Sequence, residues 1–193
     1  MRPGGKLKVS SNLGCPEITP RFFYGLTALI VSVIAMDFWT DIMPGTLSAM
    51  QMLESVGHDM SRLPESVRIF LLVNGAQGAI DNGGYNFFFE QDWPGTPPYE
   101  VFVDAYEAIG CIRQAADLRR VAGTFPFSEP HLHRDQRIAF LDTRYDKSTS
   151  CVPEWGNALC GDKEVWERLA LHIAMHKKDF PAFRPPKPWW KFW

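Results

Sequence analysis

Apolar residues recur at α-helical spacing over residues 99–122, and this pattern constrains the fold more than any other feature of the chain. The apolar stripe consists of Phe102, Ala105, Ile109, Ile112 and Ala116. Charged residues line another face of the same segment, and Gly123 follows it as a candidate C-cap. Because a helix of this kind must bury its stripe, the pattern predicts one amphipathic helix over 99–122, packed against other elements.

Several other segments also have helical length or pattern. The segment 21–43 is apolar on nearly every side, and Pro44-Gly45 is expected to end it. Gly57 is expected to end a short helix over 46–56, and Asn82-Gly83-Gly84 a longer one that starts near residue 64. Asp162 is a candidate N-cap for the last helix. With no set of alternating strands, we expect an all-α fold, a compact multi-helix bundle with a long loop-rich segment before the last helix.

This reading divides the chain into three parts. Residues 1–20 are rich in Gly, Ser, Pro and Lys and are expected to be a flexible lead-in. Residues 21–180 form the predicted helical domain, and residues 181–193 form a Pro/Trp-rich tail. Within the loop-rich segment 124–160, residues 137–141 fit either a short strand or a turn, and the sequence does not decide between them.

The charge of the chain is unevenly distributed along its length. Among 193 residues, 46% are hydrophobic and the net charge is −2, which excludes wholesale disorder and a uniformly basic nucleic-acid binder. Residues 1–21 carry a net +3, residues 22–110 a net −9 and residues 111–193 a net +4. The central segment is therefore strongly acidic and is expected to attract basic partners.

Five acidic residues are the candidate partner-binding site. Glu100, Asp104 and Glu107 follow one another at helical spacing, close to the spacing of DNA phosphates, and Glu90 and Asp92 adjoin them. The alternative interpretation is a solvated helix face that is balanced in space by the later basic helix.

No catalytic motif surrounds any nucleophile, and neither a phosphate loop nor a dinucleotide fingerprint occurs. We therefore expect no enzyme and no cofactor. A zinc-binding protein is kept as an alternative, using either His172 and His176 or His131 and His133 with two cysteines. The histidine pair lacks the glutamate of the zinc-protease motif, so no metal site is predicted.

The cysteine content and the apolar segments bear on the compartment. Four irregularly spaced cysteines do not form a disulfide framework, which favours a cytoplasmic protein with reduced thiols. The apolar run 22–36 is shorter than the ~20 residues of a bilayer span, so we do not favour a membrane protein. Membrane association through this run or through the Trp-rich tail stays an alternative.

Two linked motifs resemble a known family. The string Asn82-Gly83-Gly84-Tyr85 continues with aromatic residues to Phe89, and a second element, which runs from Ala105 to Ile109-Gly110, follows after a Trp/Pro/Gly loop. Both resemble a small helical family named after a bacterial DNA-mimic protein and first catalogued as a domain of unknown function. The resemblance covers residues 64–122 well and the last helix loosely. Turn chemistry alone accounts for the glycine motif, so a structural role is expected for it.

The resemblance implies an all-helical fold and a non-enzymatic, protein-binding role. The founding member is dimeric, and its acidic side chains are spaced like DNA phosphates and occupy a DNA-binding protein. For this chain we therefore expect an acidic helical face that binds a basic protein, with a DNA-binding protein as the implied partner, no direct contact with nucleic acid, and a homodimer as the implied assembly. A toxin-neutralising, immunity-type protein is a variant of the same idea.

Overall fold

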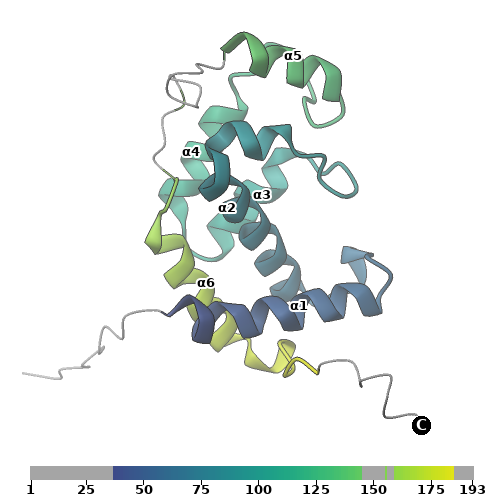
Figure 1. Ribbon diagram of the computed structural model, residues 1–193, viewed down its shortest axis with the longest axis vertical. Coiled ribbons are helices and arrows are strands. Elements are labelled where there is room, and N and C mark those ends of the chain that lie inside the picture. The colour runs from purple at the N-terminus through teal and green to yellow at the C-terminus, as the bar shows by residue number, and fades with distance from the viewer. Residues whose placement is uncertain (1–36, 145–154, 156–158, 185–193) are drawn as a thin grey trace, which may run out of the picture. The chain divides into compact units, whose positions relative to one another are not determined.

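Helix α2 (Glu65–Glu90) lies at the centre of the fold, and four other helices pack against it. The computed structural model describes residues 37–144, 155 and 159–184, and every regular element within these ranges is helical (Figure 1). Helices α1, α3, α5 and α6 all contact α2. The expected all-α fold is confirmed.

The chain enters the described region through a π-helical turn, η1 (Phe38–Ile42), which continues directly into α1 (Met43–Ser55). The prediction that Pro44-Gly45 ends a helix is therefore wrong. Pro44 lies in the first turn of α1, where a missing N–H leaves no hydrogen bond unmade. A Cβ on Gly45 would come within 2.5 Å of Ile173, so this glycine allows α1 to approach α6 closely. A short 3₁₀ turn, η2 (Met60–Arg62), then leads into α2.

The predicted single helix over 99–122 is in fact two helices, α3 (Tyr99–Ala108) and α4 (Ile112–Ala122). The chain turns at Gly110, whose φ of +84° lies in the left-handed region that favours glycine. Because of this turn, the apolar residues predicted to form one continuous stripe do not all face the core. Ile112 is 61% exposed, whereas Phe102 and Ala105 are buried. The two helices pack against each other as a hairpin.

The loop-rich segment contains a helix that the sequence did not indicate. Residues 137–141 are neither a strand nor a turn but part of α5 (Arg134–Arg144), which packs against α2. Its buried residues are Arg137 and Leu141, and most of its other side chains are polar or charged. The expected long loop is therefore interrupted by regular structure.

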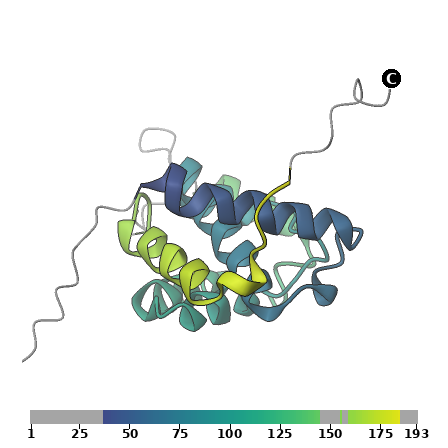
Figure 2. The ribbon, with the colours of Figure 1, turned by 90° about the horizontal axis from the view of Figure 1, so that it is seen from below.

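The last helix, α6 (Lys163–Met175), begins as expected at Asp162, whose side chain accepts a hydrogen bond from the Glu164 amide. A 3₁₀ turn, η3 (Lys177–Asp179), follows, and the chain then crosses α1 (Figure 2). Gln51 of α1 holds this crossing in place. Its amide donates to the Arg184 carbonyl at 2.8 Å and accepts from the Arg184 N–H at 3.2 Å.

Aromatic side chains cluster in one part of the core. Phe88 and Phe89 of α2 lie at its centre, with ring centroids 4.9 Å apart. Rings from α3, from the loops after α2 and α4, and from the segment before α6 pack around them: Trp93, Tyr99, Phe102, Phe125 and Trp155. The second half of α2 is therefore fixed on several sides.

Some sequence predictions lie outside the described residues. They include the flexible lead-in 1–20, the apolar run 22–36 and the Pro/Trp-rich tail from residue 185. The three-part division of the chain stays a prediction.

Candidate protein-interaction surface

Three carboxylates lie along one side of α3, and we call Glu100, Asp104 and Glu107 the α3 acidic face. They follow one another by about one helical turn. Arg119 of α4 bonds both glutamates, with Nη2 2.7 Å from Glu100 Oε1 and Nη1 3.1 Å from Glu107 Oε1. These hydrogen bonds raise the pKa of the Arg119 guanidinium. One positive charge thus serves two carboxylates.

Asp104 and Glu90 differ from these glutamates. Both are exposed, and neither has an ion-pair partner in the part of the chain that the structure describes. Asp104 lies between Glu100 and Glu107 along α3, so the α3 acidic face keeps an excess of negative charge. The later arginines reach the acidic stripe, but they offset only part of it.

Asp92 differs from the α3 acidic face because its carboxylate pairs with arginines of α5. Its carboxylate lies 2.8 Å from Arg134 Nε and 2.9 Å from Arg137 Nη2, both on α5. Two guanidinium groups therefore surround one carboxylate. Asp92 belongs to the contact between the end of α2 and α5.

Arg137 is the residue that sequence reasoning missed most completely. It is 2% exposed, and its Nε donates to the Phe89 carbonyl at 2.6 Å. Its other nitrogens donate to the carbonyls of Gln91, Pro130 and His131. A buried arginine that bonds carbonyls at a helix end closes that end of α2. Nothing in the sequence marks it as buried, since an arginine is ordinarily exposed and the carbonyls that it bonds lie up to 48 residues away.

The Asn82-Gly83-Gly84 motif produces a kink inside α2. Gly84 has φ of +67° and ψ of −164°, a conformation open almost only to glycine. Asn82 donates from its side chain to the Gly78 carbonyl at 2.7 Å, at the end of the first half of the helix. After the kink, Tyr85 is buried and its hydroxyl donates to Asp117 of α4 at 2.5 Å. Burial and this bond raise the Tyr85 pKa.

The second family motif, which ends at Ile109-Gly110, also lies at a bend of the backbone. Ile109 is buried at the end of α3, and Gly110 makes the turn into α4. The two motifs therefore lie at two backbone bends, one in α2 and one between α3 and α4.

A buried hydrogen-bond network, which no motif in the sequence indicated, joins α2, α3 and the start of α6. Gln77 accepts from the Tyr106 hydroxyl at 3.0 Å and donates to Asp81 at 2.6 Å. Asp81 in turn accepts from the Gly161 amide at 2.8 Å and the Trp166 indole at 3.0 Å. Each carboxylate oxygen of Asp81 has a donor within the protein, which indicates a structural role.

The described residues contain no cluster of metal-ligating side chains that would support either zinc-site alternative. No group of three or more His, Cys, Asp or Glu side chains there is arranged to hold a metal ion. His172 is buried, and its Nε2 lies 2.8 Å from the Ser66 carbonyl, which makes that nitrogen the donor. Burial lowers the His172 pKa. The His176 ring is its neighbour at 4.6 Å.

Two of the four cysteines lie in the described part, Cys111 and Cys160, and both are free thiols. Burial, followed by the charge of Glu164, raises the Cys111 pKa to about 12. Cys160 is exposed. A search of the described helices finds none that is long and apolar enough to cross a bilayer.

Comparison with known proteins identifies one family. The family model described as DMP19-like protein matches residues 61–174, which span α2 to α6 and include both glycine motifs and the α3 acidic face. No curated protein and no solved structure matches the chain. Since the family model covers more than half of the chain, the protein belongs to the DMP19-like family.

Proposed function

We propose that this protein is a non-enzymatic interaction protein of the DNA-mimic type, whose α3 acidic face binds the basic, DNA-binding surface of another protein. Membership of the DMP19-like family supports a DNA-mimic, protein-interaction role, and this family is not a known family of enzymes. The observation that carries the proposal is the arrangement on α3, where Glu100 and Glu107 share the Arg119 guanidinium and the exposed Asp104 between them has no ion-pair partner among the described residues.

The electrostatics of α3 suit this role. Exposed carboxylates of one sign on one helix face concentrate the local field and speed the encounter with a positively charged partner. Arg119 holds Glu100 and Glu107 in fixed positions, which lowers the side-chain entropy that binding would otherwise cost. Asp104, with no such partner among the described residues, is the carboxylate most available to a basic side chain.

The proposed surface consists of the α3 acidic face together with Glu90. Asp92 is left out because Arg134 and Arg137 already hold its carboxylate. Without Asp92, the proposed surface contains only carboxylates that either have no ion-pair partner among the described residues or share Arg119.

The test replaces the three carboxylates with amides of the same shape, in the variant Glu100→Gln, Asp104→Asn, Glu107→Gln. The control variant, Glu129→Gln, Asp135→Asn, Asp142→Asn, changes three exposed carboxylates outside α3 and alters the net charge equally. Each immobilised protein is exposed to a nuclease-treated lysate of the source cells, and the retained DNA-binding proteins are titrated at several salt concentrations. Loss of three exposed charge contacts is expected to weaken binding by about tenfold.

The expected pattern has three parts. The α3 variant binds the partner about tenfold more weakly, the control variant binds it as wild type does, and duplex DNA competes with wild-type protein for the same partner. If the α3 variant retains the partner with unchanged affinity and unchanged salt dependence, the proposed surface is wrong.

A further inference from the structure

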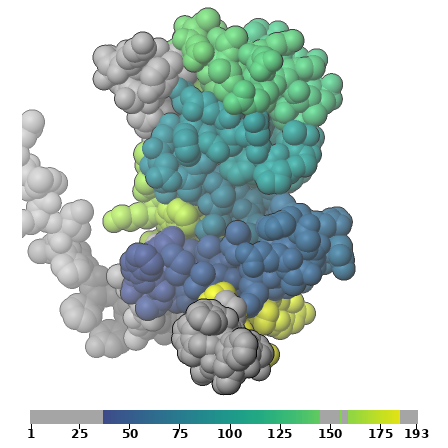
Figure 3. Space-filling view, turned by 45° about the vertical axis from the view of Figure 1, so that its right-hand side comes forward, coloured from purple at the N-terminus to yellow at the C-terminus, as the bar shows by residue number. Residues whose placement is uncertain are grey.

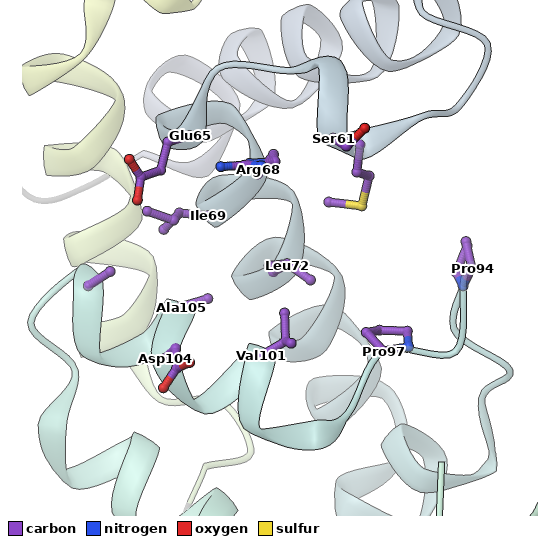
Figure 4. A pocket seen from close by; sticks show the side chains of 12 residues that line it. Ser61, Glu65, Arg68, Ile69, Leu72, Pro94, Pro97, Val101, Asp104 and Ala105 are labelled. Carbon is purple, nitrogen blue, oxygen red and sulfur yellow. The ribbon is translucent and has the colours of Figure 1, made fainter. Parts of the chain in front are cut away.

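An open groove of about 570 Å³ lies beside the α3 acidic face (Figure 4). The first turns of α2 form one wall, α3 forms the other, and η2 and the loop before α3 border one end. In Figure 3 the blue surface of η2 and early α2 lies below the teal surface of this region, with a recess between them. None of the residues of the hydrogen-bond network described above lines this groove.

The floor of the groove is apolar and only partly covered. Ile69 and Leu72 of α2 face Val101 and Ala105 of α3 across it. Ile69, Leu72 and Val101 are half-buried, so their side chains still contact water. Burial of such side chains under a partner is favourable because it removes apolar surface from water.

The rim of the groove carries three charged side chains, Glu65, Arg68 and Asp104. None of them forms an ion pair with another described residue. Glu65 and Asp104 lie toward one end of the groove, and Pro94 and Pro97 toward the other (Figure 4). With two carboxylates against the single guanidinium of Arg68, the rim keeps one net negative charge, and both carboxylates lie at the end away from the prolines (Figure 4).

We propose that this groove binds a short amphipathic helix of the protein partner, with apolar side chains on the floor and basic side chains beside Glu65 and Asp104. The proposal rests on the proposed function, because Asp104 belongs both to the α3 acidic face and to the groove rim. It adds the chemistry of the partner: a basic surface next to an apolar helical stripe.

Geometry favours a helix over an extended peptide. A peptide that binds as a strand needs a free sheet edge, and the described residues contain no strand. A helix satisfies its own backbone hydrogen bonds and needs only apolar contacts and charged neighbours from a groove. An open groove between two helices, with charges at the rim and none on its floor, offers those contacts.

The experiment uses a fluorescent peptide of ~14 residues, about four helical turns, made of leucine and lysine with all leucines on one face. A scrambled peptide of the same composition has the same charge and no apolar face. Fluorescence anisotropy measures the affinity of both for the full chain. We expect the amphipathic peptide to bind at least about tenfold more tightly than the scrambled one.

Two variants alter the groove in different ways. Val101→Gln makes its floor polar, and Ala108→Trp fills it from the exposed end of α3. Ile112→Gln is the matched control, since it removes an exposed aliphatic side chain outside the groove. Circular dichroism and the melting temperature establish that each variant is folded. Both groove variants are expected to lose the preference for the amphipathic peptide, and the control to keep it.

The outcomes separate this inference from the proposed function. Equal binding of the two peptides by wild-type protein, or an unchanged preference in both folded groove variants, overturns the groove as a helix site. Retention of the DNA-binding partner by the α3 variant overturns the proposed function instead. Loss of the partner in the α3 variant together with an unchanged peptide preference in the groove variants leaves the acidic face standing and refutes the groove.

Discussion

Arg137→Met is expected to be the most destabilising single substitution at a charged residue of α5. The side chain is 2% exposed and donates five hydrogen bonds, four of them to backbone carbonyls and one to Asp92. Methionine fills a similar volume but donates none of these bonds. The carbonyls at the end of α2 and in the loop before α5 then have no partner.

The magnitude follows from the acceptors that lose their donor. Each buried acceptor that loses its hydrogen-bond donor costs about 1–3 kcal/mol, and removing one partner of a buried ion pair costs about 3–5 kcal/mol. The weakest two of the bonds, at 3.3 and 3.4 Å, add little. We therefore expect a loss of about 3–5 kcal/mol, a large part of the ~5–15 kcal/mol that stabilises a typical domain.

Arg134→Met is the matched control. Arg134 pairs with the same Asp92 carboxylate at 2.8 Å but is 59% exposed, and its loss leaves Asp92 bonded to Arg137. An exposed pair of this kind contributes about 0.2–1 kcal/mol.

Urea unfolding, followed by circular dichroism, measures the difference. With a slope of about 2 kcal/mol per molar urea, the Arg137 variant should unfold about 2 M earlier than wild type, and the control within about 0.5 M of it. Equal midpoints for the two variants would refute the assignment of Arg137 as the residue that closes the end of α2.

Three further predictions concern a pH dependence, a backbone bend and a thiol. Burial lowers the His172 pKa in the folded protein below 6.5, so below about pH 6.5 the unfolded chain binds a proton more readily than the folded protein does. The free energy of unfolding should therefore fall as the pH falls through this range. Urea midpoints measured across the range should fall less in His172→Gln than in wild type. Gly84→Ala should cost about 1–3 kcal/mol, whereas Gly78→Ala, in open helical surroundings, should add up to about 1 kcal/mol; thermal melts of both variants in parallel check the sign. Iodoacetamide should label Cys160 in the native protein and Cys111 only after unfolding, and peptide mapping that found Cys111 labelled first would contradict its raised pKa.

The helices that the sequence revealed are those with a strong local signal. Asp162 marks the start of α6, and the side chain of this residue does cap the helix. The Asn82-Gly83-Gly84 motif marks the kink in α2, because Gly84 takes a backbone conformation that suits almost only glycine and this residue type is visible in the sequence. Both are features of a few neighbouring residues.

The helices that the sequence missed depend on distant contacts. Helix α5 is held by Arg137, whose acceptors include the carbonyl of Phe89, 48 residues away. The long helix predicted over 99–122 divides because α3 and α4 fold back on each other, although the local pattern runs on through Gly110. In both cases packing decided against the local propensity.

The candidate site shows the same division. The sequence supplied the acidic stripe on α3, because the spacing of carboxylates along one helix is a local property. It did not supply Arg119 or the groove beside Asp104, because both bring together side chains from different helices.

The sequence by itself determined the all-helical class, the acidic centre of the chain and the glycine interruption in α2, since each follows from residue types at short range. Only the tertiary structure decided which carboxylates stay unpaired. Asp92 is taken up by α5, Glu100 and Glu107 share Arg119, and Asp104 keeps an exposed charge at the edge of an apolar groove. The physical reason is that the charge of a surface depends on the distances between ionic groups, and folding sets those distances between residues far apart in the chain.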